Sequence, residues 1–242
     1  MSSILLAGLV VLATHALEAV TGFGCTVLAL PFVTALLGLR EGVLVLTVLA
    51  FIISSYIAIA KRRDIDFKRY AIILGFVLAG LPVGMLLFRS VDPAPAKKAL
   101  AAFIVLASAA QLAKLLLPRL AGGRLPRAAA YALLVAGGIV HGMFSSGGPL
   151  VVLYASRELP EKGAFRATLC LLWTSLNAII IGSYLASGEL GAGSLRTIGL
   201  LLPFLAAGIL LGERLHDRVE QRSFSIVVFS ALLLSGAVML AS

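Results

Sequence analysis

Two apolar stretches, EAVTGFGCTVLALP at Glu18–Pro31 and HGMFSSGGPLVVLY at His141–Tyr154, are each interrupted by a short group of small residues. The interruption runs over 22–24 in the first stretch and over 145–149 in the second. Glycine is unfavourable inside a helix and adopts backbone conformations that end one. We therefore expect each stretch to contain the end of one helix and the start of the next.

The composition of the chain is that of a membrane protein. Of its 242 residues, 60% are hydrophobic and 13% are charged, against about 25% charged residues in soluble domains, and its mean hydropathy is +1.07. A spanning helix needs about 20 apolar residues, so there is room for on the order of eight to ten segments and for no soluble domain. The N-terminus lacks the basic start of a secretory signal and is expected to be the first of these segments.

Charge and cysteine content exclude other classes of function. The net charge is +9, but Lys and Arg lie in short loops between apolar runs, which indicates lipid headgroups and topology rather than nucleic acid. Cys25 and Cys170 both lie inside apolar runs, so neither a disulfide framework nor a zinc site is expected. We predict no metal, no cofactor and no nucleic-acid partner.

The apolar runs form two series in the same order, which predicts two repeats. The first repeat, 1–120, is expected to hold a hairpin over 4–37 and helices over 43–60, 70–88 and 99–117. The second repeat, 121–242, is expected to hold a hairpin over 128–156 and helices over 167–186, 195–211 and 224–241. Matching residues recur at a nearly constant separation, in the pairs His15 and His141, Gly24 and Gly148, Gly84 and Gly212, and Lys98 and Arg222.

Loop charge favours hairpins over single broken spans. If each interrupted stretch turns back, about three quarters of the 20 Lys and Arg residues fall on one side, whereas single broken spans divide them evenly. Cytoplasmic loops are enriched in Lys and Arg. We therefore predict that both termini lie outside and that the loops around Arg62, Arg124, Arg157 and Arg218 lie in the cytoplasm.

Whether the hairpins are re-entrant or fully spanning stays open, although the apolar arm Pro149–Ser156 is too short to cross alone. Eight residues of helix cover about 12 Å, against a hydrocarbon core of about 30 Å. In either case each repeat crosses the membrane an odd number of times, so the second repeat is inserted upside down. The predicted fold is an all-α polytopic membrane protein with two inverted-topology repeats, an architecture typical of secondary transporters.

Glu18 is the only acidic residue inside an apolar run. An ionisable group at membrane depth usually faces the interior of a bundle or an aqueous cavity, which makes Glu18 a candidate functional residue. His15 lies one helical turn before it, and His141 has the corresponding place in the second repeat. We expect these three residues to serve proton coupling or selectivity, while hydrogen bonding between helices is the alternative role.

The interruptions themselves predict an anion site. A helix that begins deep in the protein presents unpaired amide groups and a positive dipole end, and no Lys or Arg lies within an apolar run to compete with it. Close helix packing or hinging is the alternative use of such glycines. The candidate substrate-binding residues lie at the interruptions or on a later helix, and they are Gly22, Phe23, Gly24, Cys25, Thr26, Ser145, Ser146, Gly147, Gly148 and Asn177. Further polar residues that fit the lining of such a cavity are Ser54, Ser55, Trp173 and Thr174.

The two quoted stretches, and nearly the whole chain with them, resemble the sulfite exporter (TauE/SafE) family, also called the toluene-sulfonate uptake permeases. This resemblance implies two homologous halves and transport of a small sulfur-containing anion such as sulfite or an organosulfonate. It also implies export across the bacterial cytoplasmic (inner) membrane. The expected partners are that anion, the lipid bilayer and protons as coupling ions, with the oligomeric state left open.

The leading hypothesis is a secondary transporter coupled to the proton gradient, and not an enzyme. A passive anion channel would share the site without the coupling. An intramembrane serine hydrolase is the third alternative, because Ser145 and Ser146 lie close to His141. It is weaker because the only histidine after these serines is His216, in a charged loop.

Overall fold

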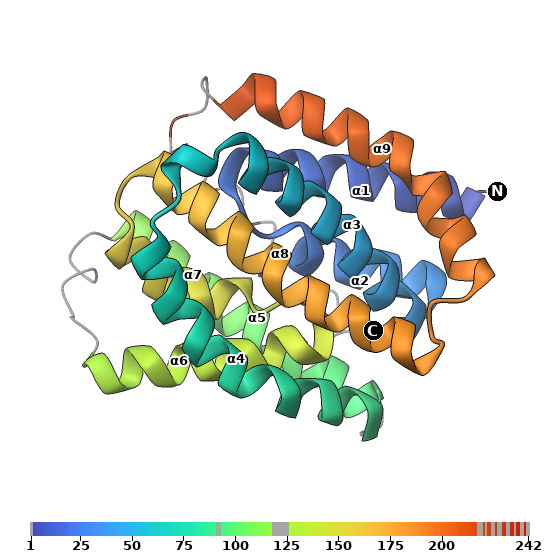
Figure 1. The fold of residues 1–242 in the computed structure, drawn as a ribbon, viewed down its shortest axis with the longest axis horizontal. Helices are drawn as coiled ribbons and strands as arrows, with labels where there is room; N and C mark the ends of the chain where they lie inside the picture. Colours follow the sequence, from blue (N-terminus) through green and yellow to red (C-terminus); the bar gives the residue numbers. More distant parts are fainter. Residues whose placement is uncertain are drawn as a thin grey trace.

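The structure is a computed structural model that describes residues 2–90, 93–117, 126–216, 220, 222, 223, 226, 229, 230, 233, 234, 236, 237 and 240. Within these residues it is helical and contains no strand (Figure 1). The helices are α1 (Ser2–Thr21), α2 (Cys25–Leu37), α3 (Leu39–Ala60), the 3-10 turn η1 (Arg62–Asp64), α4 (Phe67–Ser90), α5 (Pro93–Leu116), α6 (Arg127–Phe144), α7 (Gly148–Glu158), α8 (Lys162–Ser187) and α9 (Ala192–His216).

Helix length and apolar content confirm a multi-pass membrane protein. Within the described residues, six helices are long and apolar enough to span, namely α1, α3, α4, α6, α8 and α9. By contrast α2 has 13 residues and α7 has 11, or about 20 and 16 Å of helix, which is short of a hydrocarbon core of about 30 Å. The predicted helix over 224–241 lies largely outside the described residues, and the predicted repeat boundaries stay predictions.

Each predicted hairpin corresponds to one long and one short helix, α1 with α2 and α6 with α7. In the second, a Cβ atom on Gly137 would lie 3.1 Å from Val151 and 3.3 Å from Leu150, so α7 folds back along α6. In Figure 1, α2 likewise returns beside α1. The interruptions at 22–24 and 145–147 are therefore turns between antiparallel arms.

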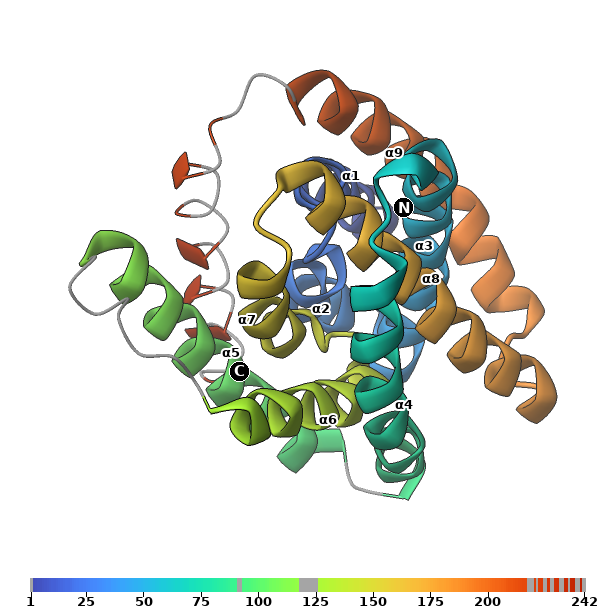
Figure 2. The same ribbon diagram turned by 60° about the vertical axis from the view of Figure 1, so that its left-hand side comes forward.

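The long helices pair in an exchanged pattern, in which a helix of one predicted repeat packs along the hairpin of the other. Helix α9 packs along α1, α4 packs along α6, and α3 packs against α8 between them (Figures 1 and 2). This exchange is what a twofold relation between the two halves would give. The inverted orientation of the halves stays a prediction.

Glycines allow the two outer pairs to approach closely. Gly84 of α4 meets the backbone of Ile139 and Gly142 in α6, and Gly212 of α9 meets the backbone of Ala16 in α1. A side chain at either glycine would collide with that neighbouring backbone. Such contacts are the usual way in which membrane helices pack. Gly84 and Gly212 are also one of the residue pairs that relate the two halves in the sequence.

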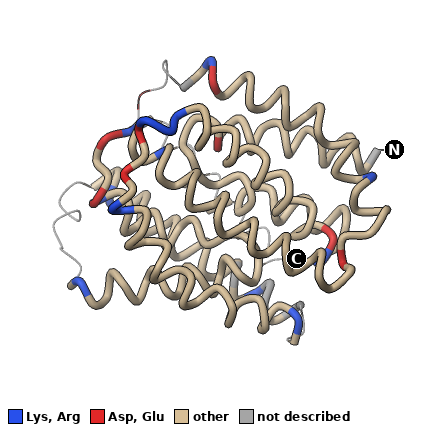
Figure 3. Tube along the Cα trace, viewed as in Figure 1, with Lys and Arg blue, Asp and Glu red and all other residues tan. Residues whose placement is uncertain are grey.

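Charged residues gather at the two ends of the bundle, with few between (Figure 3). At one end Arg69 forms an ion pair with Glu158, and the amide of Asp66 donates to Thr168 Oγ1 at 2.9 Å. These contacts join the loop before α4 and the first turn of α4 to the end of α7 and the start of α8, so the loops before α4 and α8 lie at the same end of the bundle. Single broken spans would place those two loops on opposite sides of the membrane, so their contact supports the hairpin arrangement.

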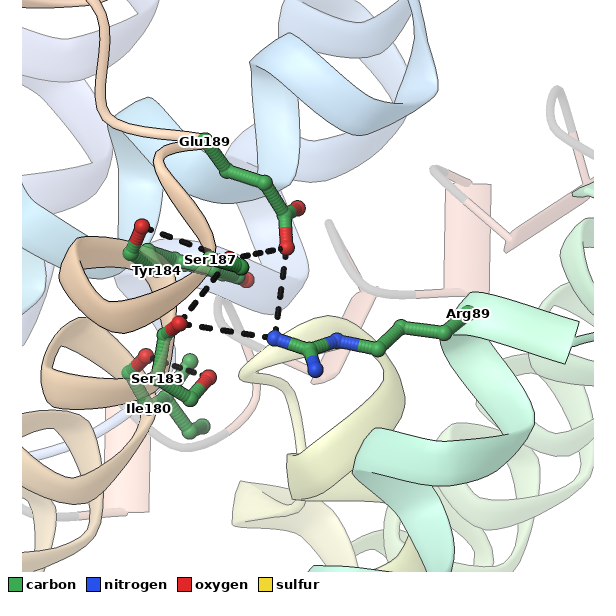
Figure 4. A network of polar contacts seen from close by, with 6 residues as sticks. All are labelled: Arg89, Ile180, Ser183, Tyr184, Ser187 and Glu189. Carbon is green, nitrogen blue, oxygen red and sulfur yellow. Dashed lines mark hydrogen bonds and ion pairs between the residues drawn. The ribbon is translucent and has the colours of Figure 1, made fainter.

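A second network closes the opposite end of the bundle (Figure 4). There Arg89, at the end of α4, pairs with Glu189 at 3.3 Å and donates to the carbonyl oxygen of Ser183. Ser187 donates to the same Glu189 carboxylate at 2.6 Å. The ends of α4 and α8 therefore lie together, as the hairpin topology requires. Which end faces the cytoplasm stays a prediction.

Candidate functional site

The turn of the first hairpin contains two glycines whose backbone conformation other residues rarely adopt. Gly22 and Gly24 have φ angles of 79° and 104°, in the region that disfavours a side chain. The Thr21 hydroxyl donates to the Phe23 carbonyl oxygen at 2.9 Å and stabilises the turn. A Cβ on Gly22 would also lie 2.8 Å from Cα of Arg166 in α8, so this turn presses on that helix.

The second hairpin makes the same kind of turn with different chemistry. Ser145 follows α6 with a φ of 51°, and it is the only non-glycine described with a positive φ. Its hydroxyl lies 2.5 Å from Thr47 Oγ1 in α3, while the Ser146 hydroxyl donates to the Phe144 carbonyl oxygen at 2.9 Å. Helix α7 then begins at Gly148 with Pro149 in its first turn, a favoured place for proline.

The two turns meet at one buried cavity. Its volume is about 20 Å³, roughly what one or two ordered waters need. The lining comes from both hairpins, α3 and α8, and consists of Glu18, Gly24, Thr26, Val27, Ala50, His141, Ser145, Ser146, Gly148, Trp173 and Asn177. Ala50 is near the middle of α3, and Trp173 and Asn177 are near the middle of α8, so the cavity lies at mid-depth in the bundle.

Glu18 caps the start of α2 from inside the protein. Its Oε2 accepts a hydrogen bond from the Cys25 amide at 3.1 Å, and its Oε1 accepts one from the Ser54 hydroxyl at 3.1 Å. The side chain is only 3% exposed. A carboxylate of the protein thus occupies the positive end of α2. At the start of α7, no side chain in the described part of the chain forms such a cap.

His141 lies beside the start of α7 and is held by α8. Its Nε2 donates to Asn177 Oδ1 at 3.0 Å, and its ring stacks on Trp173 with a centroid distance of 5.3 Å. Nδ1 is buried and has no hydrogen-bond partner among the described residues, so in the neutral ring it is a free acceptor. Protonation would turn it into a donor and add a positive charge at the cavity.

Trp173 connects the two hairpins. Its indole N–H donates to the carbonyl oxygen of Gly22 at 3.0 Å, while its ring faces His141. One helix, α8, therefore holds the turn of the first hairpin and the histidine of the second. Movement of α8 would change both sides of the cavity together.

His15 and His141 are not equivalent in space. His15 is fully buried in α1, but it does not line the cavity. Its Nδ1 donates to the Val11 carbonyl oxygen at 2.8 Å, and its Nε2 has no partner in the described part of the chain. Of the predicted coupling residues, Glu18 and His141 therefore reach the cavity directly, and His15 lies behind Glu18 on the same helix.

The predicted substrate-binding residues divide into a lining group and a supporting group. The cavity is lined by Gly24, Thr26, Ser145, Ser146, Gly148 and Asn177. Gly22, Phe23, Cys25 and Gly147 lie in the turns without lining it. Phe23 packs edge-on against Phe165, with ring centroids 6.1 Å apart, and Cys25 contributes its backbone amide to Glu18. Among the lining residues, Val27 and Ala50 were not predicted, because apolar side chains carry no pattern that distinguishes a cavity wall from a core.

Arg166 corrects one prediction. Lys and Arg were expected in the short loops between the apolar runs, but α8 begins at Lys162 and Arg166 is buried in its first turns. It forms an ion pair with Glu213 of α9 and its backbone contacts Gly22. Its sequence neighbours give no sign of this burial, because its partner Glu213 lies on a different helix.

Comparison with known proteins gives one match that covers nearly the whole chain. The model of the family described as Sulfite exporter TauE/SafE matches residues 6–239. The comparisons with curated proteins and with solved structures found no match.

Proposed function

We propose a transport function for this chain, which belongs to the sulfite exporter TauE/SafE family and is a membrane transporter of that type. In this proposal it carries a small sulfur oxyanion through the cavity between its two hairpins. The proposed substrate is sulfite or an organosulfonate. The proposed direction is outward across the bacterial cytoplasmic membrane, with both termini outside and with two repeats of opposite orientation.

The convergence of two helix starts on one cavity at mid-depth carries the proposal. A helix start attracts anions through its free amide groups and its dipole, and transporters use interrupted helices in this way. None of the residues that line the cavity is Lys or Arg. An anion held by amides and hydroxyls alone is bound without a permanent opposing charge, which favours release.

Glu18 gives the site a means of coupling to protons. An oxyanion cannot share the start of α2 with an ionised carboxylate that accepts from the Cys25 amide, because the two negative charges would repel. Protonation of Glu18 removes that repulsion, so anion and proton enter the cavity together. Binding is then favoured by low pH on the side from which the substrate enters.

His141 and Asn177 are proposed to recognise the oxyanion at the other helix start. The His141 ring, fixed by Asn177 and Trp173, offers a second site for a proton next to the unoccupied start of α7. His15 is proposed to act on coupling rather than on binding, through Glu18 one turn away on α1. The role of each histidine is thus separable by experiment.

The small cavity requires movement during transport. With room for one or two waters, it does not admit a sulfur atom with three oxygens unless the hairpin ends separate. Gly22 and Gly24 form the first turn with positive φ angles, and glycine can reach backbone conformations that other residues cannot. We propose alternating access, in which the two hairpins move against the central helices α3 and α8.

Flux in proteoliposomes tests this function. Sulfite, sulfate, thiosulfate, an alkyl sulfonate and acetate are each measured with and without an imposed pH gradient, for the native protein and for Glu18→Gln. We expect sulfite or the sulfonate to move faster when the side of substrate entry is acidic, and Glu18→Gln to lose that stimulation. Equal flux with and without the gradient would instead indicate a passive channel, and immobility of every sulfur anion would exclude this substrate class.

The arrangement of the serines does not favour a hydrolase. The Ser146 hydroxyl donates to a backbone carbonyl, the Ser145 hydroxyl bonds Thr47, and neither bonds a histidine in the described residues. A serine nucleophile needs a base within hydrogen-bond reach. Ser146→Ala is accordingly expected to retain transport.

A further inference from the structure

A second, larger cavity lies at one end of the bundle, apart from the transport site. Its volume is about 500 Å³, and it opens between the first turns of α4 and α6 and the last turns of α7. In Figure 1, α6 begins and α7 ends on the left-hand side of the molecule. The lining residues are Arg69, Arg127, Ala130, Tyr131, Leu133, Leu153, Tyr154, Arg157 and Glu158. None of them lines the central cavity.

The charge of this arginine pocket is positive. Three guanidinium groups, from Arg69, Arg127 and Arg157, share the lining with a single carboxylate, that of Glu158. Glu158 is already in an ion pair with Arg69. Among the lining residues, basic side chains therefore outnumber acidic ones by three to one. Guanidinium groups are suited to bind phosphate because they offer several donors in one plane.

Polarity in the pocket changes with depth along the helices. Arg127 is the first residue of α6 and Leu133 lies six residues, or about 9 Å, further into the bundle. On α7 the order is reversed, with Arg157 in the last turn and Leu153 about one turn deeper. The charged groups thus lie at the helix ends, where a bilayer has its headgroups, and the leucines lie at the depth of the acyl chains.

Two tyrosines mark the boundary between these zones. The rings of Tyr131 and Tyr154 are 6.1 Å apart, and Tyr131 also stacks on Phe76 at 4.2 Å. Tyrosine is enriched at membrane interfaces because its ring is apolar and its hydroxyl is polar. The pocket therefore matches a ligand that has an anionic head, an interfacial neck and an apolar tail. A free inorganic anion would use only the first of these.

We propose that the arginine pocket binds an anionic phospholipid, with the phosphate among Arg69, Arg127 and Arg157 and an acyl chain along Leu133 and Leu153. Basic pockets between membrane helices are known to take lipid headgroups. The site goes beyond the transport function, because it joins α4, α6 and α7 at their ends rather than in the cavity. A bound lipid would hold the second hairpin against α4.

Native mass spectrometry of the detergent-purified protein tests this site. The probes are phosphatidylglycerol, phosphatidylcholine, glycerol phosphate, which is a headgroup without tails, and inorganic phosphate. We expect saturable binding of one phosphatidylglycerol and much weaker binding of phosphatidylcholine. We also expect no displacement by millimolar phosphate or glycerol phosphate. Equal binding of the two lipids, or displacement by free phosphate, would overturn the lipid assignment.

Matched double variants locate the site. Arg127→Gln with Arg157→Gln is expected to weaken phosphatidylglycerol binding by roughly ten- to thirtyfold, since each basic group near the surface contributes on the order of 1 kcal/mol. The control, Arg62→Gln with Arg63→Gln, removes the same charge from exposed positions on η1, outside the pocket, and is expected to change binding less than threefold. Arg127→Lys with Arg157→Lys, which keeps the charge, should restore most of the affinity. Equal losses in the test and control pairs would show that the lipid responds to surface charge alone.

Discussion

The two hairpins both turn back at mid-depth in the bundle, but they place different side chains at the start of their second helix. At the first, a carboxylate of the protein, Glu18, accepts from the amide at the start of α2, and glycines form the turn. At the second, Ser145 forms the turn, no side chain caps α7, and His141 lies alongside with one free ring nitrogen. One hairpin therefore places an acidic side chain at its helix start, and the other places a histidine with a free acceptor nitrogen beside its own. An asymmetric site of this kind can bind an anion and a proton together.

The largest effect is expected from steric change at the first turn. Gly22→Val should cost about 3 kcal/mol or more, because it combines a positive φ with a Cβ placed 2.8 Å from Cα of Arg166. Gly148→Ala, the control in the second hairpin, meets only the Phe23 ring at 3.8 Å and should be tolerated. Yield of folded protein and thermal unfolding measure both. Similar stability of the two variants would mean that the hairpins are structurally equivalent.

The next effect concerns proton coupling in the first hairpin. Glu18→Gln keeps the size of the side chain and one of its two acceptor oxygens but removes its charge, so stimulation of flux by a pH gradient should fall from several-fold to none. Basal flux should persist. Glu41→Gln, which alters a carboxylate that bonds Ser194 in another part of the structure, is the control and should leave the stimulation intact. If Glu18→Gln responded to the pH gradient as the native protein does, Glu18 would not be the coupling residue, and the proposed difference in role between the two hairpins would be wrong.

A smaller effect is expected on substrate affinity in the second hairpin. His141→Phe preserves an aromatic ring against Trp173 but removes the bond to Asn177, and the half-saturating substrate concentration should rise about tenfold. The chain has a single tryptophan, so quenching of its fluorescence by substrate measures the affinity directly. His15→Phe should leave this affinity unchanged, because His15 does not line the cavity. Equal losses in the two variants would show that the effect is one of packing.

The smallest effect is expected at the turn of the second hairpin. Ser145→Gly relieves a positive φ, which stabilises the protein, and removes the contact with Thr47, which destabilises it. The net change in unfolding free energy should be within about 1 kcal/mol, and transport should persist. Chemical or thermal unfolding measures this balance. A loss above about 2 kcal/mol would mean that the hydroxyl contact is what holds the second turn in place.

Much of the fold could be predicted from the sequence because membrane helices need long apolar runs. The hairpins and helices α3, α4, α8 and α9 were predicted within a few residues at most boundaries, and α5 begins earlier than expected. Loop charge alone distinguished hairpins from single broken spans, and the contact between Arg69 and Glu158 agrees with that choice. These features depend on composition over many residues, which averages out local exceptions.

The site could be predicted only in part, because it depends on which helix faces cross. Glycine and serine at the interruptions indicated the two turns, and Glu18 was conspicuous as a buried acid. The sequence did not indicate that Glu18 caps α2, that His15 does not line the cavity, or that Arg166 is buried against Gly22. Each of these depends on contacts between residues that lie on different helices or in a turn, and no spacing along one helix reports such contacts.

The exchanged packing of the outer helices has a consequence for biogenesis. Among the described long helices, α1 is made first and α9, which packs along it, is made last, so the contact between Ala16 and Gly212 forms late. At roughly 5 to 20 residues per second, the ribosome takes about 10 to 40 s to reach that glycine. During this interval the face of α1 that packs against α9 is without that neighbour, although α2 and α3 are already made. For the second hairpin the corresponding contact can form at once, because α4 is made before α6. The packing of α1 is therefore completed only after α9 is made. Truncation before α9 would leave the hairpin that contains Glu18 without the helix that packs along it.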